Sequence, residues 1–146
     1  VLAGVRGWLM KNFERQIADL GLQNDVVLLG YVDDTELHWL YQNCFAFLYP
    51  SLFEGFGMPV LEAMSLGAAV IASNTTSIPE IVGDAGLLVD PKSEESICQA
   101  MKSLLDDSSL RRDLRSLAYL RSQKFSWQTS ARQVLAIYQS LDNLPV

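Results

Sequence analysis

The sequence predicts an α/β fold in which a parallel β-sheet carries helices on both faces. Short apolar segments of strand length alternate with helical patterns along the 146 residues, and this alternation is typical of right-handed βαβ units. One segment, residues 44–49, is apolar without interruption, as expected for a strand buried on both faces. Ligands of such sheets bind at the carboxyl ends of the strands.

The first two strands and the helix between them are predicted near the amino terminus. Residues 1–3 are expected to end a strand, and residues 26–30 form the next one. The intervening helix has one apolar face, made of Leu9, Phe13, Ile17 and Leu20. Gly21 is suited to end this helix because glycine readily adopts the left-handed conformation of a C-cap.

Asp33 and Glu36 predict the start of the second helix, because their spacing suits a capping box. Its apolar positions are Leu37, Leu40, Tyr41 and Cys44. This register gives way to the strand at residues 44–49. After a loop, Pro59 is suited to the first position of a third helix, which ends near Gly67.

The second half of the chain is predicted to hold two more strands and four helices. They are a strand at residues 68–73, a short helix at 78–83, a strand at 86–90, and helices at 93–105, 109–123 and 127–142. Ser93 and Ser126 are suited to cap two of these helices, because a serine hydroxyl accepts from a free backbone amide. The stripe on the helix at 93–105 comprises Ile97, Ala100, Met101, Leu104 and Leu105.

Composition and charge restrict the class of protein. The length suits one domain over residues 1–146, and no apolar run approaches the roughly 18 residues of a membrane span, so we expect a soluble globular chain. Two cysteines are too few for a disulfide scaffold, and the chain does not open on a secretory leader, so a cytoplasmic location is expected. The net charge of -6 argues against nucleic acid as a partner.

The loop after the strand at residues 44–49 is the candidate site. Gly55 and Gly57 let the backbone approach a ligand and adopt positive φ. The helix that follows begins with free amides, which attract anions. We therefore expect a phosphate, or hydroxyls next to one, above residues 56–60.

Two glutamates, Glu54 and Glu62, lie on either side of this turn. Glu62 is predicted in the first turn of the helix, where the dipole favours a carboxylate that can accept from a ribose diol. Glu54 precedes the helix and can reach a second polyol. A structural interpretation remains open for both residues: Glu62 complements the helix dipole, and Glu54 is a solvated loop residue.

Residues 50–91, PSLFEGFGMPVLEAMSLGAAVIASNTTSIPEIVGDAGLLVDP, resemble the signature of the family-4 (group 1) retaining glycosyltransferases of the GT-B type. The hallmark of that family is two glutamates separated by seven residues, and Glu54 and Glu62 have this spacing. The resemblance runs from Val1 to about Trp127 and includes GYV at residues 30–32 and FSW at residues 125–127.

By this resemblance the chain is a Rossmann-like, donor-binding half of an enzyme that transfers a sugar, with retention, from a nucleotide diphosphate sugar to an acceptor. The resemblance implies that Glu62 binds the ribose hydroxyls. It implies that Glu54 positions the donor sugar rather than acting as a nucleophile. The segment beside the sugar and diphosphate comprises Gly55, Phe56, Gly57 and Met58, with Val60 and Leu61 packed nearby. The residues that border the base are Gly30, Tyr31 and Val32. The resemblance implies no cofactor and no metal.

The sequence also departs from the family pattern. The family's first strand, its glycine-rich turn and its Arg/Lys pair for the diphosphate are not found, and Arg6 is a further phosphate candidate that does not match that pair. Because the absent strand would lie at the centre of the sheet, we expect its neighbours to lack a partner. We therefore expect a fragment of a longer chain, without the acceptor-binding N-terminal domain and inactive alone.

Two alternatives remain: half of a GT-B nucleotide-sugar epimerase, or a non-catalytic nucleotide-sugar binding module. The spacing of the glutamates favours transfer. The donor is expected to be a UDP- or GDP-sugar, and the likeness of residues 3–9 to bacterial mannosyltransferases of polysaccharide assembly favours GDP-mannose. The basic cluster Arg111, Arg112 and Arg115 is interpreted as a solvated helix face, although the resemblance allows peripheral association of the full-length enzyme with the inner face of the membrane.

Overall fold

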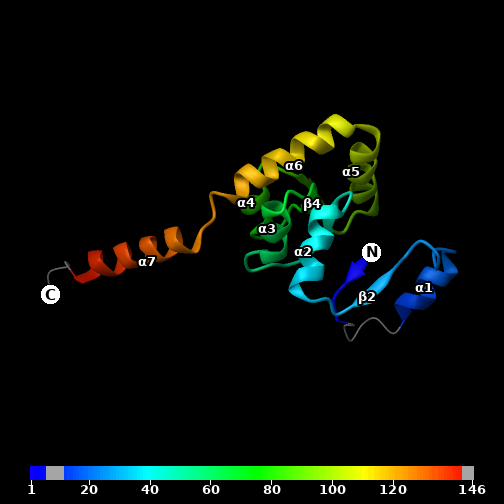
Figure 1. The fold of residues 1–146 in the computed structure, drawn as a ribbon, viewed down its shortest axis with the longest axis horizontal. Helices are drawn as coiled ribbons and strands as arrows, with labels where there is room; N and C mark the ends of the chain where they lie inside the picture. The colour runs from blue at the N-terminus through cyan, green and yellow to red at the C-terminus, as the bar shows by residue number, and fades with distance from the viewer. Residues whose placement is uncertain (6–11, 143–146) are drawn as a thin grey trace. The chain divides into compact units, whose positions relative to one another are not determined.

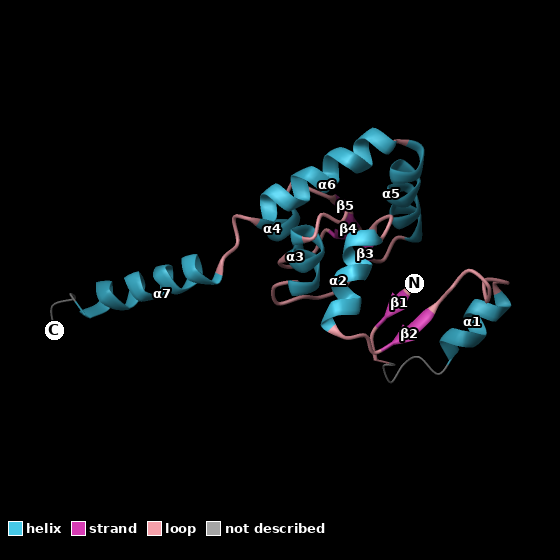
Figure 2. Cartoon of the chain, viewed as in Figure 1, coloured by secondary structure: helices cyan, strands magenta, loops and turns pink. Residues whose placement is uncertain are grey.

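The computed structural model describes residues 1–5 and 12–142, whose course is drawn in Figure 1. The chain divides into two compact units, Val1–Leu40 and Tyr41–Val146. Each unit contains parallel strands together with helical segments (Figure 2). This confirms the predicted α/β class.

The first unit contains one parallel pair of strands. Its elements are β1 (Leu2–Ala3), α1 (Phe13–Asp19), β2 (Leu28–Gly30) and the first part of α2 (Asp34–Asn43). The strands align Leu2 with Leu28, and the register shifts before Ala3 pairs with Gly30. Helix α1 buries Ile17, as predicted, whereas Leu9 of the predicted apolar face lies outside the described residues.

The start of α2 is the predicted capping box. The amide of Glu36 donates to Asp33 Oδ1 at 2.8 Å, and the amide of Asp33 donates to Glu36 Oε2 at 3.1 Å. Two free amides at the helix start are satisfied reciprocally in this way. The helix ends at Asn43, so Cys44 lies beyond it rather than in its last turn.

The second unit contains a three-stranded parallel sheet and its helices. The strands are β3 (Phe47–Tyr49), β4 (Val70–Ser73) and β5 (Leu87–Val89), in the order β3-β4-β5. The helices are the end of α2, then α3 (Met58–Ser65), α4 (Ile78–Val82), α5 (Glu94–Asp106), α6 (Ser108–Ser122) and α7 (Trp127–Asp142). The side chains of Ser93 and Ser126 cap α5 and α7, as predicted, by accepting from the amides of Ser96 and Thr129.

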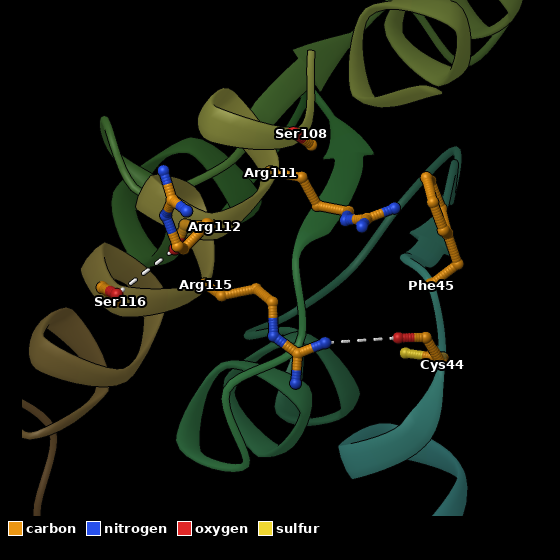
Figure 3. A pocket seen from close by; sticks show the side chains of 7 residues that line it. All are labelled: Cys44, Phe45, Ser108, Arg111, Arg112, Arg115 and Ser116. Atoms are coloured by element: carbon orange, nitrogen blue, oxygen red, sulfur yellow. Dashed lines mark hydrogen bonds between the residues drawn. The ribbon is translucent and has the colours of Figure 1, made fainter. Parts of the chain in front are cut away.

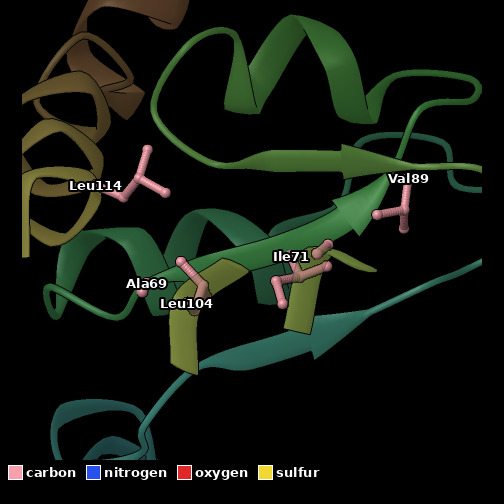
Figure 4. Packing of buried hydrophobic residues seen from close by; sticks show 6 residues of the cluster. Ala69, Ile71, Val89, Leu104 and Leu114 are labelled. Carbon is pink, nitrogen blue, oxygen red and sulfur yellow. The ribbon is translucent and has the colours of Figure 1, made fainter. Parts of the chain in front are cut away.

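Strand β4 is the centre of this unit. All four of its residues are buried, and α3, α4, α5 and α6 each contact it. The core on one side consists of Ala69, Ile71, Val89, Ala100, Leu104 and Leu114 (Figure 4). The predicted stripe of α5 is only partly buried, because the sheet and α6 cover Ala100 and Leu104 and leave Met101 and Leu105 exposed.

The strands do not form one continuous sheet within the described residues. Strand β1 pairs only with β2, and β3 pairs only with β4, so each has one edge without a neighbour. Every open sheet has such edges, so the expected absence of a central strand stays a prediction. No helix in the described part of the chain is both long and apolar enough to cross a membrane.

Candidate functional site

Two loops at the carboxyl end of the three-stranded sheet are joined by hydrogen bonds. The first runs from β3 to α3 and carries Glu54, and the second runs from β4 to α4. The amide of Glu54 donates to Thr76 Oγ1 at 3.2 Å. The hydroxyl of Ser77 lies 3.1 Å from the carbonyl oxygen of Glu54 and 2.8 Å from that of Phe56. The second loop therefore holds the backbone of the first.

Thr76 is held in an unfavourable conformation. Its φ of 56° lies in the left-handed region, which is strongly disfavoured for a β-branched residue. Such strain persists only where the surroundings fix it, and it is concentrated at functional sites. The bond from the Glu54 amide to the Thr76 side chain is one contact that fixes it here.

The carboxylate of Glu54 is oriented by two hydroxyl groups. Its Oε1 accepts from the Tyr49 hydroxyl at 2.6 Å and from Ser51 Oγ at 2.9 Å. Within the described residues its Oε2 accepts no hydrogen bond. Burial, helped by the bond to Glu54, raises the pKa of Tyr49 to about 12. The phenol therefore remains a donor at neutral pH.

Sequence reasoning named Glu54 but missed Tyr49 and Ser51. Tyr49 ends β3 and Ser51 follows two residues later, and a tyrosine at a strand end has no spacing rule that ties it to a loop carboxylate. Thr76 and Ser77 carried a weaker signal, because they follow the adjacent strand of the same sheet.

The turn into α3 requires one of its two glycines. Gly57 is the N-cap and has a φ of 101°. A Cβ built on it would lie 2.5 Å from Ile78 Cδ1. Gly55 has no positive φ, and a Cβ there would meet nothing within 4 Å. The predicted positive φ is thus confirmed for Gly57 and wrong for Gly55. Neither φ nor space requires a glycine at position 55.

Helix α3 begins one residue earlier than predicted, at Met58, so Pro59 is its second residue. Pro59 has no N–H, and the amide of Val60 already donates to the carbonyl oxygen of Gly57 at 3.0 Å. Among the described residues, the amides of Gly57 and Met58 have no partner. Both lie at the helix start, where free backbone amides attract anions; Met58 is exposed and Gly57 is buried.

The side chains around this helix start differ in how deeply they are buried. Val60 is fully buried, so it can support the site only by packing, whereas Leu61 is partly exposed. Phe56 lies edge-on to Phe125 with 6.2 Å between ring centroids. This contact joins the loop to the FSW segment at residues 125–127.

Glu62 is the fifth residue of α3, and the prediction of the first turn was wrong. The helix starts at Met58 directly after the glycine cap, which moves Glu62 into the second turn. There the dipole has less effect, because it falls off within the first turn. Dipole complementation therefore explains Glu62 poorly.

The carboxylate of Glu62 has an aromatic neighbour and no ionic one. It makes no hydrogen bond or ion pair within the described part of the chain. Burial, together with the negative charge of Glu62, raises the pKa of Tyr41 to about 12. Both oxygens of this half-buried carboxylate are therefore available to hydroxyl donors.

A row of three aromatic rings runs between the two glutamates. Tyr41 lies edge-on to Phe47 at 5.0 Å, and Phe47 stacks with Tyr49 at 5.7 Å between centroids. Tyr41 is the neighbour of Glu62, and Tyr49 binds Glu54. The end of α2 and strand β3 thus form the wall along which both carboxylates are placed.

Four residues of the predicted site have no determined position relative to Glu54 and Glu62. Gly30, with a φ of 71°, the exposed Tyr31 and Val32 belong to the first unit, so their contact with a base stays a prediction. Arg6 lies outside the described residues. The described residues contain no group of three or more His, Cys, Asp or Glu side chains that can hold a metal ion, and the absence of a metal requirement stays a prediction.

Comparison with known proteins shows the family and the fold of the chain. The family described as "Glycosyl transferases group 1" matches residues 1–121. The O-antigen chain mannosyltransferase B of Escherichia coli is 39% identical over 142 residues, which cover 97% of this chain and 37% of that protein.

Two solved structures have the same fold. The sucrose-phosphate synthase from Thermosynechococcus elongatus has a TM-score of 0.84 at 28% identity, over 96% of this chain and 37% of that one. Anabaena Alr3699/HepE, solved in complex with UDP-glucose, has a TM-score of 0.84 at 26% identity, over 95% of this chain and 40% of that one. The chain thus spans less than half the length of these proteins. It belongs to the group 1 glycosyltransferase family and has the Rossmann-like fold of one half of a GT-B enzyme.

Proposed function

We propose that this chain is the donor-binding half of a retaining glycosyltransferase that uses a nucleotide diphosphate sugar. The observation that carries the proposal is the arrangement of Glu54. One of its oxygens is fixed by Tyr49 and Ser51, and the other has no partner in the described part of the chain. A carboxylate held in this way is preorganised to accept a hydrogen bond from a ligand.

Each polar group of the site has a part in this proposal. Glu54 accepts from a hydroxyl of the donor sugar, and Glu62 accepts from the ribose diol. The amides of Gly57 and Met58 donate to the diphosphate at the start of α3. The ribose, diphosphate and sugar then lie in sequence along the wall formed by β3 and the end of α2.

Glu54 positions the sugar rather than attacking it. The two hydroxyl donors on Oε1 fix the orientation of the carboxylate, which suits a group that positions a ligand. Retaining transfer depends mainly on stabilising a developing oxocarbenium ion and a departing diphosphate. A fixed negative charge beside the sugar and helix amides beside the diphosphate serve these two needs.

We propose a mannose donor, GDP-mannose, for the full-length enzyme. The name of the Escherichia coli relative supports mannose, and guanine rests on sequence resemblance alone. A UDP-sugar is the competing candidate, because a structural neighbour was solved with UDP-glucose. We further propose that the enzyme acts in the cytoplasm or at the inner face of the membrane, needs no metal or cofactor, and requires a separate acceptor-binding domain.

Ligand-observed NMR tests the proposal directly. The chain and its Glu62→Ala variant are titrated with GDP-mannose, GDP, UDP and ADP at millimolar concentration. We expect base-selective binding that is lost in Glu62→Ala and kept in Glu94→Gln, a matched control because Glu94 is exposed in the first turn of α5. Binding that is indifferent to the Glu62 substitution would contradict the proposed site. Assay of the full-length protein for mannosyl transfer then separates a transferase from an epimerase or a binding module.

A further inference from the structure

A hollow of about 560 Å³ lies at the other end of β3 from Glu54. Its lining consists of Cys44, Phe45, Ser108, Arg111, Arg112, Arg115 and Ser116 (Figure 3). Cys44 and Phe45 lead into β3, whereas Glu54 follows it. The hollow and the donor loop are therefore separated by the length of the strand.

The charge of this hollow is opposite to that of the chain. The sequence has 17 Asp and Glu against 11 Lys and Arg, yet three arginines and no carboxylate line the hollow. Within the described residues, none of the three guanidinium groups forms an ion pair. The cluster is thus a site of uncompensated positive charge on an acidic protein.

Two of the arginines are held in place by the segment that leads into β3. The guanidinium of Arg111 lies 3.9 Å from the centroid of the Phe45 ring. Arg115 donates to the carbonyl oxygens of Gln42 at 3.1 Å and Cys44 at 3.5 Å. These contacts fix both side chains on the same wall, as Figure 3 shows for Arg111 and Arg115.

These contacts use only some of the N–H donors of the guanidinium groups. Each guanidinium has five N–H donors, and Arg115 uses two of them, whereas Arg111 makes a stacking contact that leaves its donors unused. Arg111 and Arg115 are also four residues apart on one helix, where like charges repel each other. An anion between them removes this repulsion and fills the unused donors.

We propose that this hollow binds a phosphate group. The planar fork of arginine matches the geometry of phosphate oxygens and binds them in a bidentate manner. The hydroxyl of Ser108, exposed at the first position of α6, is a further donor at the same rim. The exposed ring of Phe45 adds an apolar contact for the rest of the molecule. The phosphate is either free, as part of a small molecule, or the headgroup of a lipid.

The test follows backbone amide shifts of the ¹⁵N-labelled chain during titration with sodium pyrophosphate, at an ionic strength held constant with sodium chloride. We expect saturable shifts around Ser108, Ser116 and Cys44. Any pyrophosphate at the donor loop shifts residues 56–60 instead, so the two sites are read separately. Cosedimentation with phosphatidylcholine vesicles, with and without phosphatidylglycerol, distinguishes a lipid headgroup from a free phosphate.

Four variants distinguish a specific site from general charge attraction. Arg112→Gln and Arg111→Gln are expected to weaken binding by about tenfold each, the effect of one lost charge-assisted contact. Arg111→Lys keeps the charge and loses the fork, so its effect is expected to be intermediate. Arg132→Gln, on the exposed surface of α7, changes the net charge equally and should leave binding unchanged.

Arg115 is left intact in these variants because it also binds the carbonyl groups at the end of α2. Saturable pyrophosphate shifts at the hollow, or vesicle binding that requires phosphatidylglycerol and Arg111, would support the proposal and identify the source of the phosphate. The absence of both, or equal weakening by Arg132→Gln, would overturn it. Neither result depends on the donor site, so this inference stands or falls separately from the proposed function.

Discussion

The two glutamates of the candidate site are held in different ways. Glu54 lies in a loop whose backbone is bound by Thr76 and Ser77 and whose carboxylate is bound by Tyr49 and Ser51. Glu62 is carried by a helix, and its carboxylate has no partner within the described residues. An irregular loop needs many contacts to fix one side chain, whereas a helix fixes its side chains through its own backbone. Substitutions near Glu54 should therefore act through orientation, and near Glu62 only the residue itself should matter.

The largest effect is expected where the loop joins the helix. Gly57→Ala places a Cβ 2.5 Å from Ile78 Cδ1 at a φ of 101°. The left-handed conformation and the overpacking together should lower the free energy of unfolding by roughly 2–4 kcal/mol. Urea unfolding of this variant measures the effect. Gly55→Ala is the control and should change stability by less than about 1 kcal/mol, so equal losses in the two variants would contradict the stated role of Gly57.

The next effect concerns the orientation of Glu54. Tyr49→Phe removes the 2.6 Å bond to Oε1 and keeps the ring that stacks on Phe47. We expect donor-sugar binding to weaken about three- to tenfold, less than the full value of a hydrogen bond to a charged group, because this bond orients Glu54 and does not itself contact the sugar. Titration with GDP-mannose measures this, with Tyr138→Phe on α7 as a control for loss of an exposed hydroxyl. An unchanged affinity in Tyr49→Phe would show that Glu54 needs no such support.

Stability should fall in alkali between pH 10 and 12. The folded chain raises the pKa of Tyr41 and Tyr49 from 10.0 to about 12. The unfolded chain therefore loses these two protons near pH 10, while the folded chain keeps them until about pH 12. Since the unfolded state then binds fewer protons, stability decreases as pH rises through this window. Urea midpoints at pH 9 and 11 measure the change, and Tyr49→Phe should reduce its size.

The smallest effect tests the placement of Glu62. Its negative charge, after burial, contributes to the raised pKa of Tyr41. Glu62→Gln should therefore lower the pKa of Tyr41 by a fraction of a unit, which is followed on the assigned ring resonances of Tyr41 by NMR, because Glu54 affects the pKa of Tyr49. The same pKa should not move in Glu54→Gln, because Glu54 binds Tyr49 instead. A shift in Glu54→Gln alone would mean that the two carboxylates are placed differently from this account.

The sequence predicted best those features that depend on neighbours along the chain. The capping box of Asp33 and Glu36 and the caps at Ser93 and Ser126 formed as expected, because all their atoms lie within one helical turn. The strand at residues 44–49 is shorter in the structure, at Phe47–Tyr49, because burial and pairing decide where a strand begins.

Features that depend on distant contacts were not predictable from local pattern. The two glycines of the EGFG loop look equivalent in sequence, and only the φ of 101° at Gly57 and the approach of Ile78 show that Gly57 is required. The same holds for Arg115, which was interpreted as a solvated residue and instead donates to the end of α2, 73 residues away at Gln42. The spacing of Glu54 and Glu62 predicted the candidate site, whereas the residues that support them became visible only in the fold.

The measurement that tests the central claim most directly compares GDP with GDP-mannose in two variants. Glu62→Gln should weaken both ligands equally, because the ribose is common to them. Glu54→Gln should weaken GDP-mannose by about tenfold and leave GDP unchanged, because only the first carries the sugar. If Glu54→Gln weakened both ligands alike, or Glu62→Gln affected neither, the assignment of one glutamate to the sugar and the other to the ribose would be contradicted.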